Sequence, residues 1–102
     1  MTDRLEQLEK MHAADPGDPF CTYGIAMEHA KSGRLDDAIE WLDKTIDADG
    51  QYCYAYYQKA KLLSEKGEQE AGRDVLHKGM EIARAAGEGH AAEEMGELLE
   101  NI

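Results

Sequence analysis

The sequence is short of basic residues and of cysteine, and each shortage excludes a class of protein. Eleven Lys and Arg stand against twenty-two Asp and Glu, so the formal net charge is −11. Nucleic acids and anionic lipid surfaces are bound by clustered Lys and Arg, so neither is an expected partner. Two cysteines, Cys21 and Cys53, are too few for the disulfide framework of a small secreted protein.

Long apolar runs and proline are also scarce. No run is long enough to cross a bilayer, and the N-terminal residues contain no apolar segment like that of a signal peptide. We therefore expect a cytoplasmic protein without a membrane partner, with both thiols reduced. Only two prolines interrupt a chain with 42% hydrophobic and 32% charged residues, which predicts a single globular domain that is mostly helical.

What the sequence does contain is an internal repeat of 34 residues. Shifting the chain by this period aligns identical residues in two copies and, at two positions, in three. No alignment begins after residue 44, so the repeat ends near residue 83 and the last segment differs. A fixed period of this length is typical of helical repeat proteins. The identities are Asp3/Asp37, Glu6/Glu40, Ala14/Ala48, Asp15/Asp49, Tyr23/Tyr57, Ala26/Ala60, Gly33/Gly67, Leu8/Leu42/Leu76 and Lys10/Lys44/Lys78.

Start and stop signals divide the chain into six expected helices. Asp18-Pro19 is a helix start, with Asp at the N-cap and Pro at the first helical position. Gly33 and Gly67 are expected to end helices in the left-handed conformation that glycine readily adopts. The stretch QYCYAYYQKA has the aromatic content of a strand, but it occupies the place of PFCTYGIA in its repeat, which predicts a helix. The expected helices are 2–14, 19–32, 35–48, 52–66, 69–85 and 89–101.

The two full repeats resemble the tetratricopeptide repeat (TPR) family. They are PFCTYGIAMEHAKSGRLDDAIEWLDKTIDADG and CYAYYQKAKLLSEKGEQEAGRDVLHKGMEIAR, and each places a small residue, Ala26 or Ala60, where the paired helices of that family cross closely. The resemblance implies an all-α fold of antiparallel helix–turn–helix repeats, a right-handed solenoid of about six helices. The implied division is a half repeat (2–16), two repeats (19–50 and 53–84) and a capping helix (88–102).

The resemblance also implies a binding surface. In the family register six residues lie on the concave side, and aromatic residues and Met are common anchors of protein interfaces. The implied function is a non-catalytic module that binds a peptide or helix of a partner protein in an aromatic groove. Packing of these rings as additional core is the alternative. The six residues are Phe20, Tyr23, Met27, Tyr54, Tyr57 and Lys61.

Two other functions are open at this stage. The same groove would also suit association of the chain with itself. A metal site or enzyme would have to be built on Cys21, His29 and Cys53, but no CxxC, HxxxH or HExxH spacing indicates zinc. His29 is instead expected to be a buried imidazole on the core face of its helix. We expect no catalysis, no cofactor and no metal, and a solvated acidic face on the last helix formed by Glu93, Glu94, Glu97 and Glu100.

Overall fold

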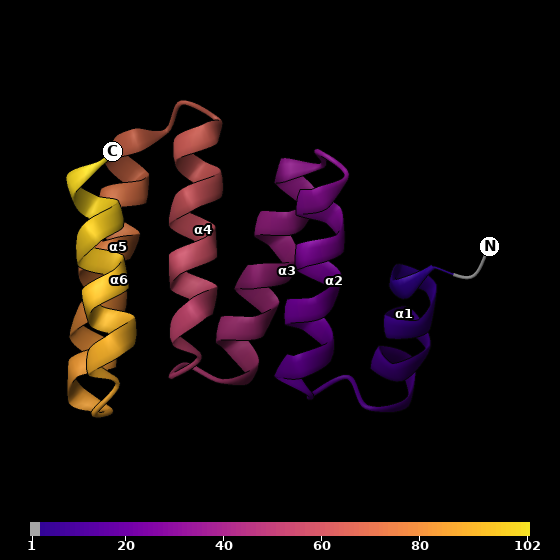
Figure 1. Ribbon diagram of the computed structural model, residues 1–102. Helices are drawn as coiled ribbons and strands as arrows, with labels where there is room; N and C mark the ends of the chain where they lie inside the picture. The colour runs from indigo at the N-terminus through magenta and orange to yellow at the C-terminus, as the bar shows by residue number, and fades with distance from the viewer. Residues whose placement is uncertain (1–2) are drawn as a thin grey trace. The chain divides into compact units, whose positions relative to one another are not determined.

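The computed structural model describes residues 3–102, which form six α-helices and no strand (Figure 1). The expected all-α fold is confirmed, and each helix begins and ends within two residues of its predicted bounds. Residue 2, with which the first helix was expected to begin, lies outside the described part of the chain. The tyrosine-rich stretch is helical. The helices are α1 (Arg4–Ala14), α2 (Pro19–Lys31), α3 (Leu35–Ala48), α4 (Cys53–Glu65), α5 (Gln69–Ala85) and α6 (Gly89–Glu100).

The chain divides into two compact units, Met1–Gly50 and Gln51–Ile102. In the first unit α2 packs against both α1 and α3, and in the second unit α5 packs against both α4 and α6. The finer division into a half repeat, two repeats and a capping helix stays a prediction. Of the helices described, none combines the length and the apolar character that crossing a membrane requires.

The helix pairs in the two units turn through the same kind of corner. Gly33 and Gly67 have φ values of 78° and 86°, which confirms the conformation expected from the sequence. Each glycine N–H donates to the carbonyl three residues back, and the N–H of the next residue donates to the carbonyl five residues back. This double hydrogen bond is the Schellman motif, which satisfies carbonyls at the end of the helix. A third corner of this form, at Gly87 (φ 76°), leads into α6.

A buried hydrogen bond joins α2 to α3 in the first unit. The Thr45 hydroxyl lies 2.8 Å from the Thr22 hydroxyl, and both residues are at most 1% exposed. Thr22 in turn donates to the carbonyl of Pro19, the first residue of α2. The N-terminus of α2 is fixed as the sequence predicts, because the Asp18 carboxylate accepts a hydrogen bond from the Phe20 N–H at 2.9 Å. Both threonine hydroxyls thus have hydrogen-bond partners although they are buried.

Close contact through glycine holds the second unit together. A Cβ atom at Gly79 of α5 would lie 2.7 Å from both the Cβ of Tyr56 in α4 and the sulfur of Met95 in α6. A Cβ at Gly72 would lie 3.0 Å from the Ala60 carbonyl oxygen. From sequence alone these glycines suggest a weak helix, because glycine has low helix propensity. The structure gives them a packing role, since they let α5 approach its two neighbours.

The alanines at the predicted crossings are fully buried. Ala26 of α2 and Ala60 of α4 both have 0% exposure, as expected from their place in the repeat. Leu42 of α3 and Leu76 of α5, which are equivalent in the repeat, are equally buried. The residues predicted to bind a partner lie on the same two helices, α2 and α4, outside the buried core.

Candidate functional site

Three of the six predicted binding residues lie on α2 and none of them belongs to the core. We call Phe20, Tyr23 and Met27 the α2 face. Phe20 is 53% exposed, and Tyr23 and Met27 are half-buried. A single exposed apolar side chain is common on protein surfaces, whereas a contiguous group of them indicates an interface. The α2 face thus offers one open ring beside two partly covered side chains.

The other three predicted residues lie on α4, and two of them are in contact. We call Tyr54, Tyr57 and Lys61 the α4 face. The rings of Tyr54 and Tyr57 meet edge to face with their centroids 6.3 Å apart and an interplanar angle of 66°. Tyr54 is 37% exposed, Tyr57 is half-buried, and Lys61 is exposed. This edge-to-face geometry is the favourable one for aromatic pairs, so the two rings support each other's orientation.

A carboxylate that the sequence did not predict belongs to the surroundings of the α4 face. The Tyr54 hydroxyl donates a hydrogen bond to Oε1 of Glu94 in α6, and His90 Nε2 lies 3.4 Å from the same oxygen. This hydrogen bond, with burial and the negative charge of Glu94 as smaller causes, raises the pKa of Tyr54 to about 12. The Glu94 side chain is still 36% exposed, so it lies at the solvated surface as expected, although it is held there by Tyr54.

Little in the sequence predicts the contact between Tyr54 and Glu94. Glu94 and His90 are four residues apart, a spacing that puts them on one side of a helix. Nothing in that spacing shows that this side of α6 reaches Tyr54, forty residues earlier in the chain. Only the packing of α6 within the second unit brings the carboxylate and the phenol together.

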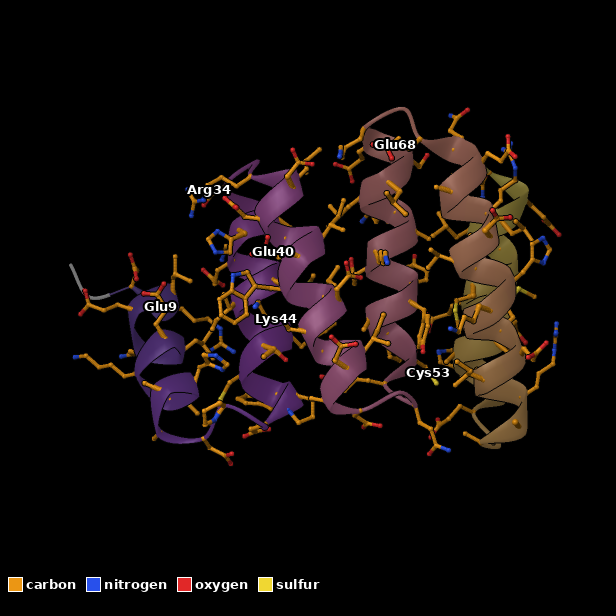
Figure 2. The ribbon with its side chains drawn as sticks, turned by 180° about the vertical axis from the view of Figure 1, so that it is seen from behind. Glu9, Arg34, Glu40, Lys44, Cys53 and Glu68 are labelled. Atoms are coloured by element: carbon orange, nitrogen blue, oxygen red, sulfur yellow. The ribbon has the colours of Figure 1, made fainter. Side chains whose placement is uncertain are left out.

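The cysteine and histidine residues do not assemble into a reactive site. Both cysteines are buried and neither is in a disulfide, and Cys53 lies at the start of α4 (Figure 2). Burial, followed by the Asp18 carboxylate, raises the pKa of the Cys21 thiol, whereas a nucleophilic cysteine needs a lowered pKa. His29 is half-exposed and accepts a hydrogen bond from Arg34 Nε at 3.0 Å, so the expected buried imidazole is wrong. Among residues 3–102, no three His, Cys, Asp or Glu side chains form a group that could hold a metal ion.

Comparison with known proteins finds two similar sequences, and one of them is named for tetratricopeptide repeats. No family model matches the chain. It is 24% identical over 98 residues to TPR repeat-containing protein PA0015 of Pseudomonas aeruginosa, and the match covers 96% of this chain and 93% of that protein. It is also 29% identical over 77 residues to superkiller protein 3 of Saccharomyces cerevisiae, covering 76% of this chain and only 5% of that much longer protein.

Solved structures similar to this chain also include a tetratricopeptide repeat domain. A tetratricopeptide repeat domain protein from Salinibacter ruber, determined by solution NMR, has a TM-score of 0.79 and 28% identity, covering 85% of this chain and 88% of that one. Protein BPP2914 of Bordetella parapertussis has a TM-score of 0.86 at 23% identity, covering 99% and 88%, which bears on the fold alone. The period of 34 residues, the paired helices with their glycine corners and these likenesses agree: the chain has the fold of tetratricopeptide repeat proteins and is similar to small bacterial proteins of that family.

Proposed function

We propose that the chain binds a segment of a partner protein through the α2 face and the α4 face, without catalysis or a cofactor. Proteins of this family are in general non-catalytic scaffolds for protein–protein interaction, and the fold supports that class of function. That the six residues line one groove stays a prediction.

The observation that carries the proposal is the open, oriented ring pair of Tyr54 and Tyr57. An exposed tyrosine normally loses rotamer freedom when it binds, which lowers affinity. Here the edge-to-face contact with Tyr57 and the hydrogen bond to Glu94 hold the Tyr54 ring in place before any partner arrives. Phe20 occupies the position of Tyr54 in the first repeat, and both are among the large hydrophobic residues most open to solvent. The two faces thus present equivalent aromatic anchors.

The acidic charge of the chain limits the kinds of partner segment that would bind. The chain carries a net charge of −11, and Glu94 is held beside the rings of the α4 face. Such a surface attracts a segment that combines apolar side chains with Lys or Arg, because a cation binds both a carboxylate and an aromatic ring. Lys61 supplies one positive charge for a single acidic group on the same partner. An amphipathic helix with a mainly basic polar side fits these features.

A peptide selection tests the proposal. Displayed libraries of helical and extended peptides would be selected against the wild-type protein and against Tyr54→Ala/Tyr57→Ala and Phe20→Ala/Tyr23→Ala variants. The control is Met11→Ala, which removes an exposed side chain (46%) of α1 that lies on neither face. We expect either double variant to weaken the selected peptides by about thirtyfold or more while the control binds normally.

Two results would contradict this proposal. If the double variants bind the selected peptides as tightly as the wild type, the faces are not the binding surface. If they lose several degrees or more of thermal stability in proportion to the lost binding, the rings belong to the core. A wild-type dimer that becomes a monomer in the Tyr54→Ala/Tyr57→Ala variant would assign the α4 face to self-association instead.

A further inference from the structure

The first helix, α1, has the fewest buried residues of the six. Leu8 is its one buried residue, whereas each of the other helices has three or more. It has 11 residues and packs mainly against α2. Isolated helices shorter than about 12–15 residues are marginal in water, so α1 depends on this contact to stay folded. A helix held by so few buried groups can open locally while the rest of the protein stays folded.

The central contact between α1 and α2 is a leucine that fills a notch. A Cβ atom at Gly24 of α2 would lie 3.0 Å from both Cδ1 and Cδ2 of Leu8, so the glycine leaves the space that the leucine occupies. We call this space the Gly24 notch. Four residues before Leu8, the Arg4 side chain lies 3.8 Å from the Glu28 carboxylate of α2. The Glu28 side chain is only 16% exposed, so α2 presents a notch and a carboxylate that lie one turn apart.

A third contact of α1 buries a polar atom without a partner. The His12 ring meets the Trp41 ring of α3 edge to face, with the centroids 5.0 Å apart. In this position Nδ1 of His12 is buried and has no hydrogen-bond partner among the described residues. Burial of an unpaired polar atom destabilises the state that buries it, and opening of α1 would return this nitrogen to water. The closed position of α1 is therefore held less firmly than a fully paired contact would hold it.

We propose that α1 is a lid that opens on its own and uncovers a surface of α2 that binds a helix of a partner protein. The partner helix places a leucine in the Gly24 notch and a Lys or Arg four residues earlier beside Glu28. Leu8 and Arg4 make these same contacts in the closed state, so α1 itself shows which side chains the surface accepts. The surface is distinct from the α2 face and the α4 face, because neither Gly24 nor Glu28 belongs to them.

Hydrogen exchange of the unaltered protein tests the opening. When a helix opens as a unit, its hydrogen-bonded amides share one level of protection, and we expect that level in α1 to be about a hundredfold or more below that of α2 and α3. The last helix, α6, is the control, since it has a similar length of 12 residues but three buried residues, and it should be better protected than α1. The proposal is overturned if α1 is as protected as α2, or if protection falls steadily along α1 as in a fraying end.

Binding of a helical peptide tests the surface under the lid. The probe has the sequence of residues 3–15 and is kept helical by a cross-link between the positions of Glu6 and Lys10, whose side chains are 57% and 77% exposed. Trp41 is the single tryptophan of the chain and the probe contains none, so its fluorescence reports binding beside the lid. We expect the Leu8→Ala protein to bind the probe about tenfold or more tightly than the wild type, because its own lid opens more readily.

Matched substitutions in the protein and in the probe identify the contacts. In Leu8→Ala/Gly24→Ala a methyl group fills the notch, so probe binding should fall about tenfold or more below that of Leu8→Ala. The control is Leu8→Ala/Gly50→Ala, because a Cβ at Gly50 would meet only the Ile46 carbonyl oxygen, at an ordinary distance of 3.9 Å. A probe with glutamine in place of its arginine should bind about twofold to fivefold more weakly.

The binding experiments can also refute the proposal. It is overturned if the wild type and the Leu8→Ala variant bind the probe equally, or if filling the notch leaves binding unchanged. It is also overturned if no variant binds the probe at millimolar concentration. Hydrogen exchange needs no substitution, so it decides whether α1 opens even where a variant does not fold.

Discussion

The two units solve the same packing problem with different residues. In the first unit Thr22 and Thr45 meet at the crossing of α2 and α3 through a hydrogen bond of 2.8 Å. At the equivalent positions of the second unit, 34 residues further along, stand Tyr56 and Gly79. There the tyrosine Cβ lies so near the glycine that an added Cβ would come within 2.7 Å of it.

The comparison shows that the residue suited to one repeat position depends on the residue that it packs against in the neighbouring helix. Where the first unit has two threonines of medium size, the second unit has a large tyrosine and a glycine without a side chain. Protein cores require filled space, and a large residue opposite a small one fills it as well as two of intermediate size. The first pair adds a buried hydrogen bond, whereas the second adds aromatic area and the sulfur of Met95.

The strongest test of this difference is Gly79→Ala. The new methyl group must displace the Tyr56 Cβ, which is attached to the backbone, so we expect α4 and α5 to separate and the free energy of unfolding to fall by about 3 kcal/mol. Chemical denaturation would measure the loss. Amide hydrogen exchange should place it in the second unit, with protection in α2 and α3 little changed.

Gly96→Ala is the matched control for that substitution. A Cβ at Gly96 of α6 would meet only the end of the Met80 side chain, at an ordinary distance of 3.6 Å. We expect it to raise stability by about 0.5–1 kcal/mol, because alanine has the higher helix propensity. Equal effects of the two substitutions would show that helix propensity, not the close contact, decides the result at Gly79.

At the glycine corners the two units should behave alike. Gly33 and Gly67 share a positive φ, and valine is strained in that conformation, so Gly33→Val and Gly67→Val should each lower stability by about 1–2 kcal/mol. Denaturation of both variants is the measurement, with Gly50→Val, at a glycine without positive φ, as the control. If only one of the two valine variants lost stability, the two corners would not be equivalent.

The threonine pair should give a smaller, coupled effect. Thr45 also lies 2.9 Å from the Trp41 carbonyl, and Thr22 keeps its bond to Pro19, so replacing either threonine leaves no hydroxyl proton unpaired. We expect Thr22→Val and Thr45→Val each to lower stability by about 1 kcal/mol, and the double variant to lose no more than one single variant. Additive losses in this cycle would mean that the hydrogen bond contributes no pairwise energy.

The smallest expected effect is a change in the pKa of Tyr54 in the second unit. The pKa of Tyr54 is raised to about 12 from an ordinary value of 10.0, so the fold favours the protonated phenol. The stabilisation is fully present below about pH 10 and is lost as the pH rises through about 12. Ultraviolet titration should show a late tyrosine component that moves toward the ordinary value in Glu94→Gln, with Glu97→Gln as a control. An unchanged late titration would remove Glu94 as its cause.

Much of the fold could be predicted from the sequence because the signals that determine it are local. Asp18-Pro19 and the glycines at 33 and 67 mark helix ends within a few residues of chain, and the period of 34 transfers one assignment to the next copy. Even the outward position of Phe20 and Tyr54 follows from register. These residues remain a predicted site, because exposure permits binding without requiring it.

The parts that could not be predicted depend on contacts between distant segments. His29 was assigned to the core by its helix face, but Arg34, beyond the glycine corner, holds its ring at the surface. Glu94 became part of the α4 surroundings only through the packing of α6, and the Gly24 notch is defined only where Leu8 of α1 meets α2. Periodicity gives the face of a helix on which a residue lies, but not the residue that it meets there.

The pairing of Tyr56 with Gly79 limits how this chain can be recombined. A hybrid that paired α4 with α3 would set Tyr56 opposite Thr45, whose branched side chain would overlap with the tyrosine that only a glycine accommodates. The reverse hybrid, α2 with α5, would set Thr22 opposite Gly79 and leave a void. Single helices are therefore not interchangeable parts, although their sequences align. The smallest segment that duplication or a protein engineer can transplant intact is the complete helix pair, cut before its first helix and after its second.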